Sequence, residues 1–372
     1  MSGNTSPALS IDQQRAAFFA ASVYTSNLLP NSTAVNPGGV TSIDVPAQGV
    51  LTSIDLIVTL NVTNSGANAA SPQYGAPYSA ITNIKMKDQT QLERLNISGL
   101  GLYKYLSFNN PPGVGLFDAA FVPAEGGALV PSYASPSIPD VAAGANAVIT
   151  FPIHIPISMN NNSTQGALQV SNNITAAAPK VELNIPTVIG GNATLPYNDA
   201  LTVTGGTVQV IYNSWVQTQN IPAGYFPTAD FANAIRLVDS ISDSTNIVAG
   251  GTKQIDMQLQ FVTDLVAITY YNGSSYEQGS DLNSITFYNG ILTVDNRPPP
   301  FHFQRYRRMH GVDGFPGTYF FDFRANPLTN QTVGLYKVLL NFATVNAGAQ
   351  TTQFYRYYVP SGSNVAGPTQ IG

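Results

Sequence analysis

Apolar and polar residues alternate along much of this 372-residue chain, which is the pattern of strands with one buried face. Clusters of Gly, Pro, Asn and Ser separate the alternating runs, as turns separate short strands. This organisation predicts an all-β fold of the sandwich or barrel type instead of a βαβ fold. The predicted strand runs are Ile54–Val62, Ala147–Ile157, Val181–Ile185, Val203–Trp215, Ile255–Tyr271, Ile285–Val294 and Leu335–Val345.

Two kinds of residue refine this strand pattern. The dipeptides Asn272-Gly273 and Asn289-Gly290 follow or interrupt strand runs, and Asn-Gly is a strong hairpin signal. Pro152 and Pro156 lie inside an alternating run. Because proline cannot donate a ladder hydrogen bond, they predict an edge strand or a bulge there.

Residues 10–24 give the strongest helix signal in the chain. Ser10 is a good N-cap, and Gln13 stands at the capping-box spacing from it. Ile11, Phe18, Phe19 and Val23 form an apolar stripe at helical intervals. Two interpretations stay open, because this stripe could pack on the helix's own domain or could reach a neighbouring subunit or a lipid surface.

The length of the chain favours two domains, since a single core stops growing at roughly 250–300 residues. A Pro- and Gly-containing segment at residues 221–227 follows a long strand run and precedes new ones. Gly49 before Ile54-Asp55 and Gly250 before Ile255-Asp256 hint at a duplication. The predicted organisation is an N-terminal arm with a helix at residues 1–39, a first domain at 40–220, a linker at 221–232 and a second domain with a C-terminal tail at 233–372.

Charge is scarce, at 9% of the residues with a net charge of −5, against roughly 25% in an ordinary soluble domain. A surface of neutral polar residues favours a protein that contacts copies of itself or other partners. No basic face is evident, which argues against direct binding of nucleic acid. The chain has no Cys, so disulfides and Cys-based chemistry are excluded. We expect neither a signal peptide nor a transmembrane helix.

Catalytic and ligand-binding motifs are not evident. The three His residues lack a metal-ligand spacing, and no nucleophile elbow or phosphate-binding loop occurs. We therefore expect no enzyme activity, metal, cofactor or small-molecule substrate. A cluster of basic residues, Arg305, Arg307 and Arg308, follows a proline run. It could contact an anionic partner or a neighbouring subunit, or it could form a loop whose arginines bind backbone carbonyls or nearby acids such as Asp313 and Asp322.

Several stretches resemble the double jelly-roll major capsid proteins of tectivirus-like phages, which are icosahedral and contain an internal membrane. The nearest stretch is Val312–Arg324, with the Arg-rich run before it and the strands Leu335–Val345 and Thr352–Val359 after it. Val141–Ile157 and Val208–Pro222 also fit, and the pieces occur in the same order. The N-terminal helix is shorter and more apolar than that family's pattern.

The resemblance implies two tandem eight-stranded jelly rolls with a short N-terminal helix. Three copies would form a pseudo-hexameric capsomer, and capsomers would form a virion shell over the membrane after assembly in the host cytoplasm. Possible further partners are the internal membrane and minor capsid or vertex proteins. Loops at Gly66–Tyr78, Asn109–Ser137 and Tyr270–Ser284 would form outer towers. The implied inner-side or membrane contacts are Ile11, Arg15, Phe18, Phe19 and Val23.

Two rival interpretations remain at this level. The chain could be a carbohydrate-binding or adhesin-like β-sandwich protein, which predicts an exposed aromatic platform and a monomer or a fibre. It could also be a polysaccharide-active enzyme, which predicts a cleft with paired carboxylates. The expected absence of a signal peptide argues against both.

Overall fold

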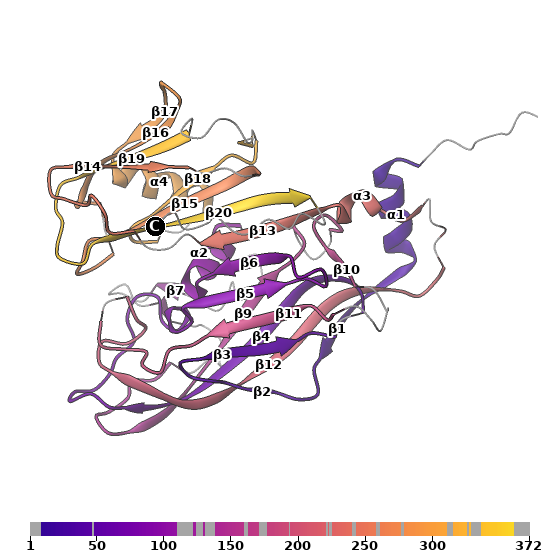
Figure 1. Cartoon of the computed structure of the whole chain (residues 1–372), viewed down its shortest axis with the longest axis horizontal. Coiled ribbons are helices and arrows are strands. Elements are labelled where there is room, and N and C mark those ends of the chain that lie inside the picture. Colours follow the sequence, from indigo (N-terminus) through magenta and orange to yellow (C-terminus); the bar gives the residue numbers. More distant parts are fainter. Residues whose placement is uncertain are drawn as a thin grey trace, which may run out of the picture.

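The computed structural model (Figure 1) contains two β-sandwiches that lie side by side and share one sheet. It describes residues 9–46, 48–109, 122–123, 129–130, 138–159, 163–170, 177–192, 194–220, 222, 225–239, 243–257, 261–276, 279–310, 315–325, 327–328 and 336–360. The elements outside the two sandwiches are α1 (Ile11–Ala20), α3 (Thr228–Phe231), the 3-10 turn η1 (Tyr78–Ala80) and the small ribbon of β7 (Val122–Pro123) with β8 (Leu129–Val130).

The first sandwich pairs a six-stranded sheet with four strands of the shared sheet. In the six-stranded sheet, β12 and β4 are central, β1 and β2 pair with β12, and β9 and β10 pair with β4. Its strands are β1 (Ser22–Leu28), β2 (Thr33–Ala34), β4 (Gly49–Asn64), β9 (Asn146–Pro156), β10 (Leu168–Val170) and β12 (Leu201–Gln217). The facing strands, in spatial order, are β3 (Val40–Asp44), β11 (Lys180–Asn184), β5 (Asn83–Lys87) and β6 (Glu93–Ile97).

The second sandwich uses the other four strands of the shared sheet and a four-stranded sheet of its own. In spatial order, the shared strands are β13 (Asn233–Asp239), β20 (Gln350–Pro360), β15 (Val262–Tyr271) and β18 (Thr318–Asp322). The facing strands are β14 (Thr252–Asp256), β19 (Tyr336–Phe342), β16 (Leu282–Asn289) and β17 (Leu292–Arg297).

Both sandwiches have the strand order of a jelly roll. In an eight-stranded jelly roll, one sheet holds the first, eighth, third and sixth strands, and the other holds the second, seventh, fourth and fifth. The second sandwich follows this order from β13 to β20. The first follows it with β1 and β2 as its first strand and β12 as its eighth, and β10 is an addition. The predicted all-β fold of two eight-stranded jelly rolls is confirmed.

Each roll also has a helix of its own, and the two helices stand at the same place in the order of elements. In the first roll, α2 (Gly99–Asn109) lies between the fifth strand, β6, and the sixth, β9. In the second roll, α4 (Pro299–His310) lies between the fifth strand, β17, and the sixth, β18. The duplication is therefore real at the level of topology. The sequence match that hinted at it does not reflect it, because Gly49 begins a third strand whereas Gly250 precedes a second strand.

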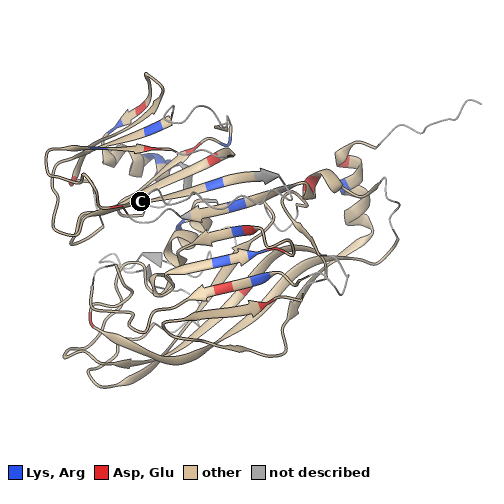
Figure 2. Ribbon diagram, viewed as in Figure 1, with Lys and Arg blue, Asp and Glu red and all other residues tan. Residues whose placement is uncertain are grey.

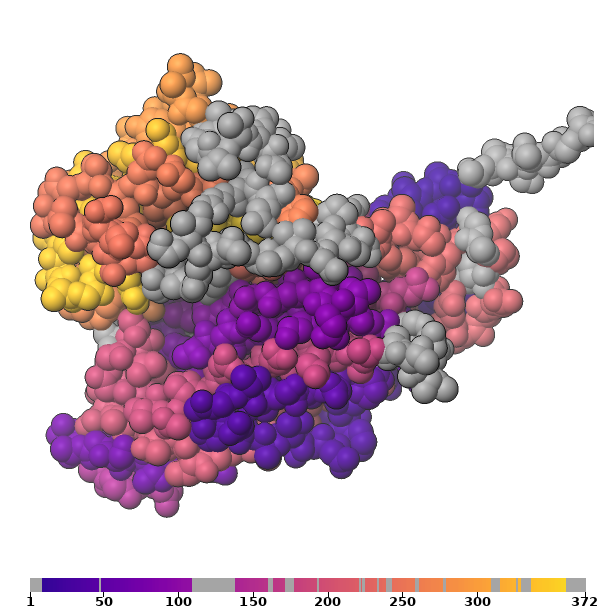
Figure 3. All heavy atoms as spheres, viewed as in Figure 1, coloured from indigo at the N-terminus to yellow at the C-terminus, as the bar shows by residue number. Residues whose placement is uncertain are grey.

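A parallel pairing of β6 with β13 joins the rolls into one continuous eight-stranded sheet. Leu237 pairs with Leu95, and both belong to the core of the first roll. The next pair places Val238 in the core of the second roll, on the opposite face of the sheet. The space-filling view in Figure 3 shows the rolls packed against each other along this junction, with α1 at one end of the molecule.

Several of the scarce charged residues form ion pairs between neighbouring strands of this sheet. Figure 2 shows Lys and Arg beside Asp and Glu on successive strands of the shared sheet. Cross-strand pairs of this kind each contribute roughly 0.2–1 kcal/mol. The pairs and their N–O distances are Lys180–Asp44 at 3.6 Å, Lys87–Glu182 at 3.1 Å, Lys85–Glu93 at 3.9 Å and Arg236–Glu93 at 3.5 Å.

Several local predictions are confirmed, and others need correction. Pro152 and Pro156 lie on β9, which pairs only with β4 among the described strands, and Asn289-Gly290 begins the turn between β16 and β17. The run Ile255–Tyr271 forms two strands, β14 and β15, instead of one. The predicted tower loop at Asn109–Ser137 lies mostly outside the described residues.

The predicted segment boundaries stay a prediction, and the topology bears on one of them. Within the proposed arm, residues 1–39, β1 and β2 pair with β12. They are therefore part of the first roll's sheet, and the segment before β1 is the part that stands outside it. β12 ends at Gln217 and β13 begins at Asn233, on either side of the proposed linker.

Adjacent leucines on β19 provide a test of the register. Leu340 is fully buried in the second core, whereas Leu339 points to the other face and is only partly buried. We expect Leu340→Ala to lower the free energy of unfolding by about 2–5 kcal/mol, because it leaves a cavity. The matched change Leu339→Ala should cost about 1 kcal/mol or less. Urea unfolding measures both, and equal losses would contradict this register.

Candidate assembly surfaces

Helix α1 begins with the predicted capping box. The Gln13 backbone N–H donates to Ser10 Oγ at 3.3 Å, and the Ser10 N–H donates to Gln13 Oε1 at 2.9 Å. The helix ends at Ala20, because residues from Ser22 onward pair with β12. Val23 therefore lies on β1 and not on the helix, which corrects the prediction of a helix through residue 24.

The apolar side of α1 packs on the chain itself. Phe18 is fully buried, with its ring centroid 5.5 Å from that of Phe226. Phe19 lies 4.9 Å from Trp215 in an edge-to-face contact. Of the five predicted contact residues, only Val23 is a largely exposed apolar side chain, at 51%. The structure thus shows the own-domain packing for Phe18 and Phe19, and Ile11 is partly buried.

An ion pair between Arg15 and Asp230 connects the same helix to α3. Arg15 Nε and Nη2 donate to the two carboxylate oxygens of Asp230 at 2.8 and 2.7 Å, and Thr164 Oγ1 also donates to Asp230. Arg15 Nη1 donates to Asp12 Oδ1 at 2.9 Å. Burial on its own would raise the pKa of Asp230, but the Arg15 and Thr164 hydrogen bonds and the Arg15 charge outweigh it, so the pKa lies below its usual value.

The arginine cluster lies on helix α4, not in a loop. One side of α4 is buried, and there the His302 ring contacts Tyr319 and Phe321 at centroid distances of 5.7 Å each. Burial lowers the pKa of His302 to about 4, so the ring is neutral at pH 7. Tyr306 on the same side donates from its hydroxyl to the Ser107 carbonyl at 3.3 Å, which connects α4 to α2.

The other side of α4 is exposed and carries the predicted arginines. Arg305 Nη1 lies 3.6 Å from an oxygen of Asp295, and Arg297 Nε lies 2.8 Å from the other oxygen of the same carboxylate, so both arginines form ion pairs with Asp295. Arg307 and Arg308 are exposed, and so is Phe301 at 55%. Of the two predicted acid partners, Asp322 forms an ion pair with Arg324, and Asp313 lies outside the described residues.

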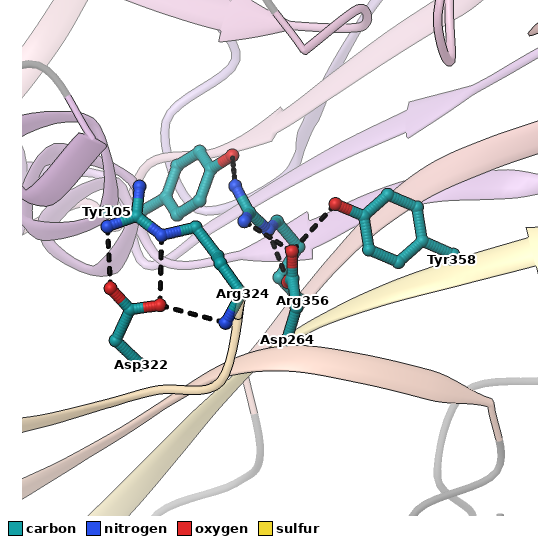
Figure 4. Close-up of polar contacts among 6 residues, drawn as sticks. All are labelled: Tyr105, Asp264, Asp322, Arg324, Arg356 and Tyr358. Carbon is teal, nitrogen blue, oxygen red and sulfur yellow. Dashed lines mark hydrogen bonds and ion pairs between the residues drawn. The ribbon is translucent and has the colours of Figure 1, made fainter. Parts of the chain in front are cut away.

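A buried network at the junction of the rolls was not predicted from the sequence (Figure 4). Arg356 on β20 donates from Nε and Nη2 to Asp264 on β15, at 2.6 and 2.5 Å. Its Nη1 lies 3.2 Å from the hydroxyl oxygen of Tyr105 on α2, and Tyr358 Oη donates to Asp264 at 2.7 Å. Arg356 is 5% exposed and Asp264 1% exposed. A bidentate pair with extra hydrogen bonds is the arrangement that a buried charge requires.

The sequence feature that could have indicated this network is a charged residue inside each of two predicted strands. Asp264 interrupts the run Val262–Tyr271, and Arg356 interrupts the aromatic strand Thr352–Val359. Burial on its own would lower the pKa of Arg356, but Tyr105 and Asp264 outweigh it and the net shift is upward. Arg356 therefore stays charged at every ordinary pH.

A second polar group lies on the outer face of the first roll. His154 Nδ1 lies 2.6 Å from Asp55, and the Asn213 side-chain amide donates to the same carboxylate at 2.5 Å. The alternation of β9 already placed His154 opposite its Ile neighbours. No group of acids and histidines that could hold a metal occurs among the described residues. Among them, too, no helix combines the length and apolar character needed to cross a membrane.

Comparison with known proteins first defines the class of protein. The major capsid protein of Sulfolobus turreted icosahedral virus matches with a TM-score of 0.64 and 12% identity, over 91% of this chain and 97% of that one. The PBCV-1 virus capsid matches with a TM-score of 0.55 and 11% identity, over 91% and 93%. The capsid protein P2 of bacteriophage PM2 matches with a TM-score of 0.52 and 11% identity, over 92% and 100%. The chain has the fold of these double jelly-roll proteins.

Part of the chain also matches the sequence model of a protein family. Residues 237–369 match the model of the family described as P3 major capsid protein C-terminal. No curated protein sequence matches the chain. The resemblance to double jelly-roll major capsid proteins, predicted from the sequence, is confirmed by the family match and by the fold. The role that these findings support is that of a structural protein of the virion shell.

Two arginines in Figure 4 give a matched test of the junction. Arg356→Met leaves Asp264 buried without its counter-charge, so we expect a loss of about 3–5 kcal/mol in the free energy of unfolding. Arg324 pairs with Asp322 but has 42% of its side chain exposed, and Arg324→Met should cost at most about 1 kcal/mol. Guanidinium unfolding curves measure both, and a small effect at Arg356 would show that the network is not structural.

Protonation of Asp230 at low pH should weaken its ion pair with Arg15 and so detach α1 from the rest of the chain. Because the folded-state pKa of Asp230 is depressed, its contribution is complete above the unfolded pKa of about 3.9 and is lost as the pH falls through the folded value. The single tryptophan, Trp215, contacts Phe19 and reports the release by its fluorescence. Asp230→Asn should show the released signal already at neutral pH, whereas Asp12→Asn, at an 84% exposed site, should keep the acid transition. An unchanged transition in Asp230→Asn would contradict this assignment.

Proposed function

We propose that the chain is the shell-forming major capsid protein of an icosahedral virus and that it works as a homotrimer. The observation that carries the proposal is the repeated topology of eight strands with a helix between the fifth and sixth strand in each roll. Because each copy supplies two similar rolls, three copies supply six, which is the number needed for a pseudo-hexameric capsomer. The neutral polar surface supports the same proposal, since large contacts between copies contain few charges at their centres.

The mechanism of such a protein is assembly without catalysis. The buried ionic groups are bound within the chain: Asp264 to Arg356, Asp230 to Arg15 and Asp88 to Arg94. These ion pairs hold elements of the chain together. The work of the subunit is then done by complementary faces that exclude water when copies meet.

The N-terminal helix is the proposed inner-side element. In Figure 1, α1 lies with α3 at one end of the elongated strands. Its apolar residues Phe18 and Phe19 pack on the chain, so the surface left for an inner partner is the polar side with Asp12 and Gln13. This favours contact with a membrane surface or a minor capsid protein over insertion into lipid. Assembly of the shell in the host cytoplasm belongs to the same proposal.

Mass measurement tests the trimer. We expect light scattering of the purified full chain to give three times the subunit mass of 39.4 kDa, with higher assemblies at raised concentration. The same sample is tested for binding on a glycan array. A stable monomer that binds a sugar would overturn the capsid proposal in favour of a carbohydrate-binding sandwich.

A further inference from the structure

A cavity of about 70 Å³ lies inside the subunit, where α2 meets the second roll's part of the shared sheet. Its wall on the first roll comes from Ser98 and α2, and its wall on the second roll comes mainly from β15, β18 and β20. A single water needs only about 10–15 Å³ of such space. The cavity therefore has room for a small polyatomic group that contacts both rolls at once.

A buried lysine forms part of the wall of this cavity. Lys104 on α2 is only 5% exposed. Its Nζ donates to Thr269 Oγ1 on β15 at 3.3 Å. The same nitrogen lies 5.0 Å from the ring centroid of Tyr276 and 5.7 Å from that of Tyr74. Because the faces of aromatic rings attract a cation, these contacts favour the charged form of the lysine.

Side chains with hydroxyl groups line the same cavity from both rolls. Ser98 comes from the first roll, and Thr269, Thr318 and Thr352 come from three strands of the second. Thr269 Oγ1 and Thr318 Oγ1 lie 3.2 Å apart, so these two hydroxyls form one polar patch. A hydroxyl hydrogen can rotate toward a ligand oxygen. No Asp or Glu is among the described residues that line the cavity.

The start of α2 adds to the positive character of the cavity. Leu100 and Gly101, in the first turn of the helix, also line it. The N-terminal end of a helix carries a partial positive charge, which favours a negative group nearby. The cavity thus combines a buried ammonium group, a helix N-terminus and several hydroxyls, and this combination suits an anion better than a cation or an apolar ligand.

We propose that this cavity binds a small inorganic oxyanion of the size and charge of phosphate. Lys104 supplies the opposite charge, and the hydroxyls of Ser98, Thr318 and Thr352 supply hydrogen bonds to the anion's oxygens. Cofactor pockets usually have volumes of about 300–1,000 Å³. The smaller volume of this cavity selects the free anion over a nucleotide. The site lies within one subunit, so the proposal is independent of the capsid function.

A bound anion would strengthen the junction of the two rolls. Lys104 is next to Tyr105, whose hydroxyl oxygen lies 3.2 Å from Arg356 Nη1 in the buried network. The anion would therefore add a second polar connection between α2 and the second roll, beside the Arg356–Asp264 pair. Because the complete site exists only when both rolls are folded and docked, binding stabilises the folded chain by mass action.

Titration of the purified full chain with inorganic phosphate tests the site. We expect calorimetry to show saturable binding of one phosphate per subunit, and the temperature of unfolding to rise with phosphate concentration. Sodium chloride keeps the ionic strength constant throughout, so that changes in charge screening do not contribute. A chain that gives neither binding heat nor a rise in unfolding temperature overturns the proposal.

A pair of lysine variants locates the bound phosphate. Lys104→Met removes the ammonium group and should weaken phosphate binding at least about tenfold. The control is Lys337→Met, because Lys337 Nζ also lies over a tyrosine ring, 5.4 Å from the centroid of Tyr288, but is not among the described residues that line the cavity. This variant should bind phosphate like the parent chain. Equal binding by Lys104→Met and the parent chain overturns the site.

A second pair of variants keeps the test available if Lys104→Met does not fold. Thr352→Val removes one lining hydroxyl with little change of shape and should weaken phosphate binding several-fold. Thr351→Val makes the same change at the adjacent position of β20, which points to the opposite face of the sheet, and should keep the parent affinity. Phosphate also stabilises proteins in general by exclusion from their surface, and that effect is the same in both variants. Equal affinities of the two variants overturn the assignment.

Discussion

The parallel pairing of β6 with β13 is the contact on which the rest of the molecule depends. It merges two rolls into one sheet and places their cores on opposite faces, with Leu95 and Leu237 facing one core and Val238 facing the other. Two rolls joined by a linker alone would be free to reorient, since small interfaces between domains permit motion. A shared sheet fixes their relative orientation through backbone hydrogen bonds, and the buried Arg356–Asp264 pair with Tyr105 closes the junction from the side of α2.

The distribution of charge follows from this rigid arrangement. A chain with so few ionic side chains could have used them to keep a monomer soluble. Instead, many lie in cross-strand pairs on the shared sheet or in buried pairs at the junction and beside α1. Paired charges contribute little to the net field around the molecule. The neutral faces and the α4 arginines then remain as the surfaces that distinguish one side of the subunit from another.

The sequence predicted the fold class well because alternation is a local property. The run from Ile149 to Ile155 on β9, the prolines of its edge and the Ser10–Gln13 cap all depend on residues close in the chain. The failures came from long-range pairing. Val23 follows a convincing helix but pairs with Val216 on β12, and Arg305 lies in a helix where prolines suggested a loop. The Asp264–Arg356 network joins residues 92 positions apart, so nothing in either local stretch identified the partner.

The same local patterns indicate which strand faces are covered once the topology is known. β4 and β15 are both third strands, yet their sequences differ in a systematic way. On β4, buried Leu56, Val58 and Leu60 alternate with partly exposed residues, as in a strand with one covered face. On β15, the residues from Thr263 to Ile268 are buried without alternation, as in a strand covered on both faces. α2 supplies the second cover for β15 within the chain. The outer side of β4 has no such cover within the described chain at Ile57 and Thr59, and its mixture of Ile57, Thr59 and Asp55 suits a face that contacts water.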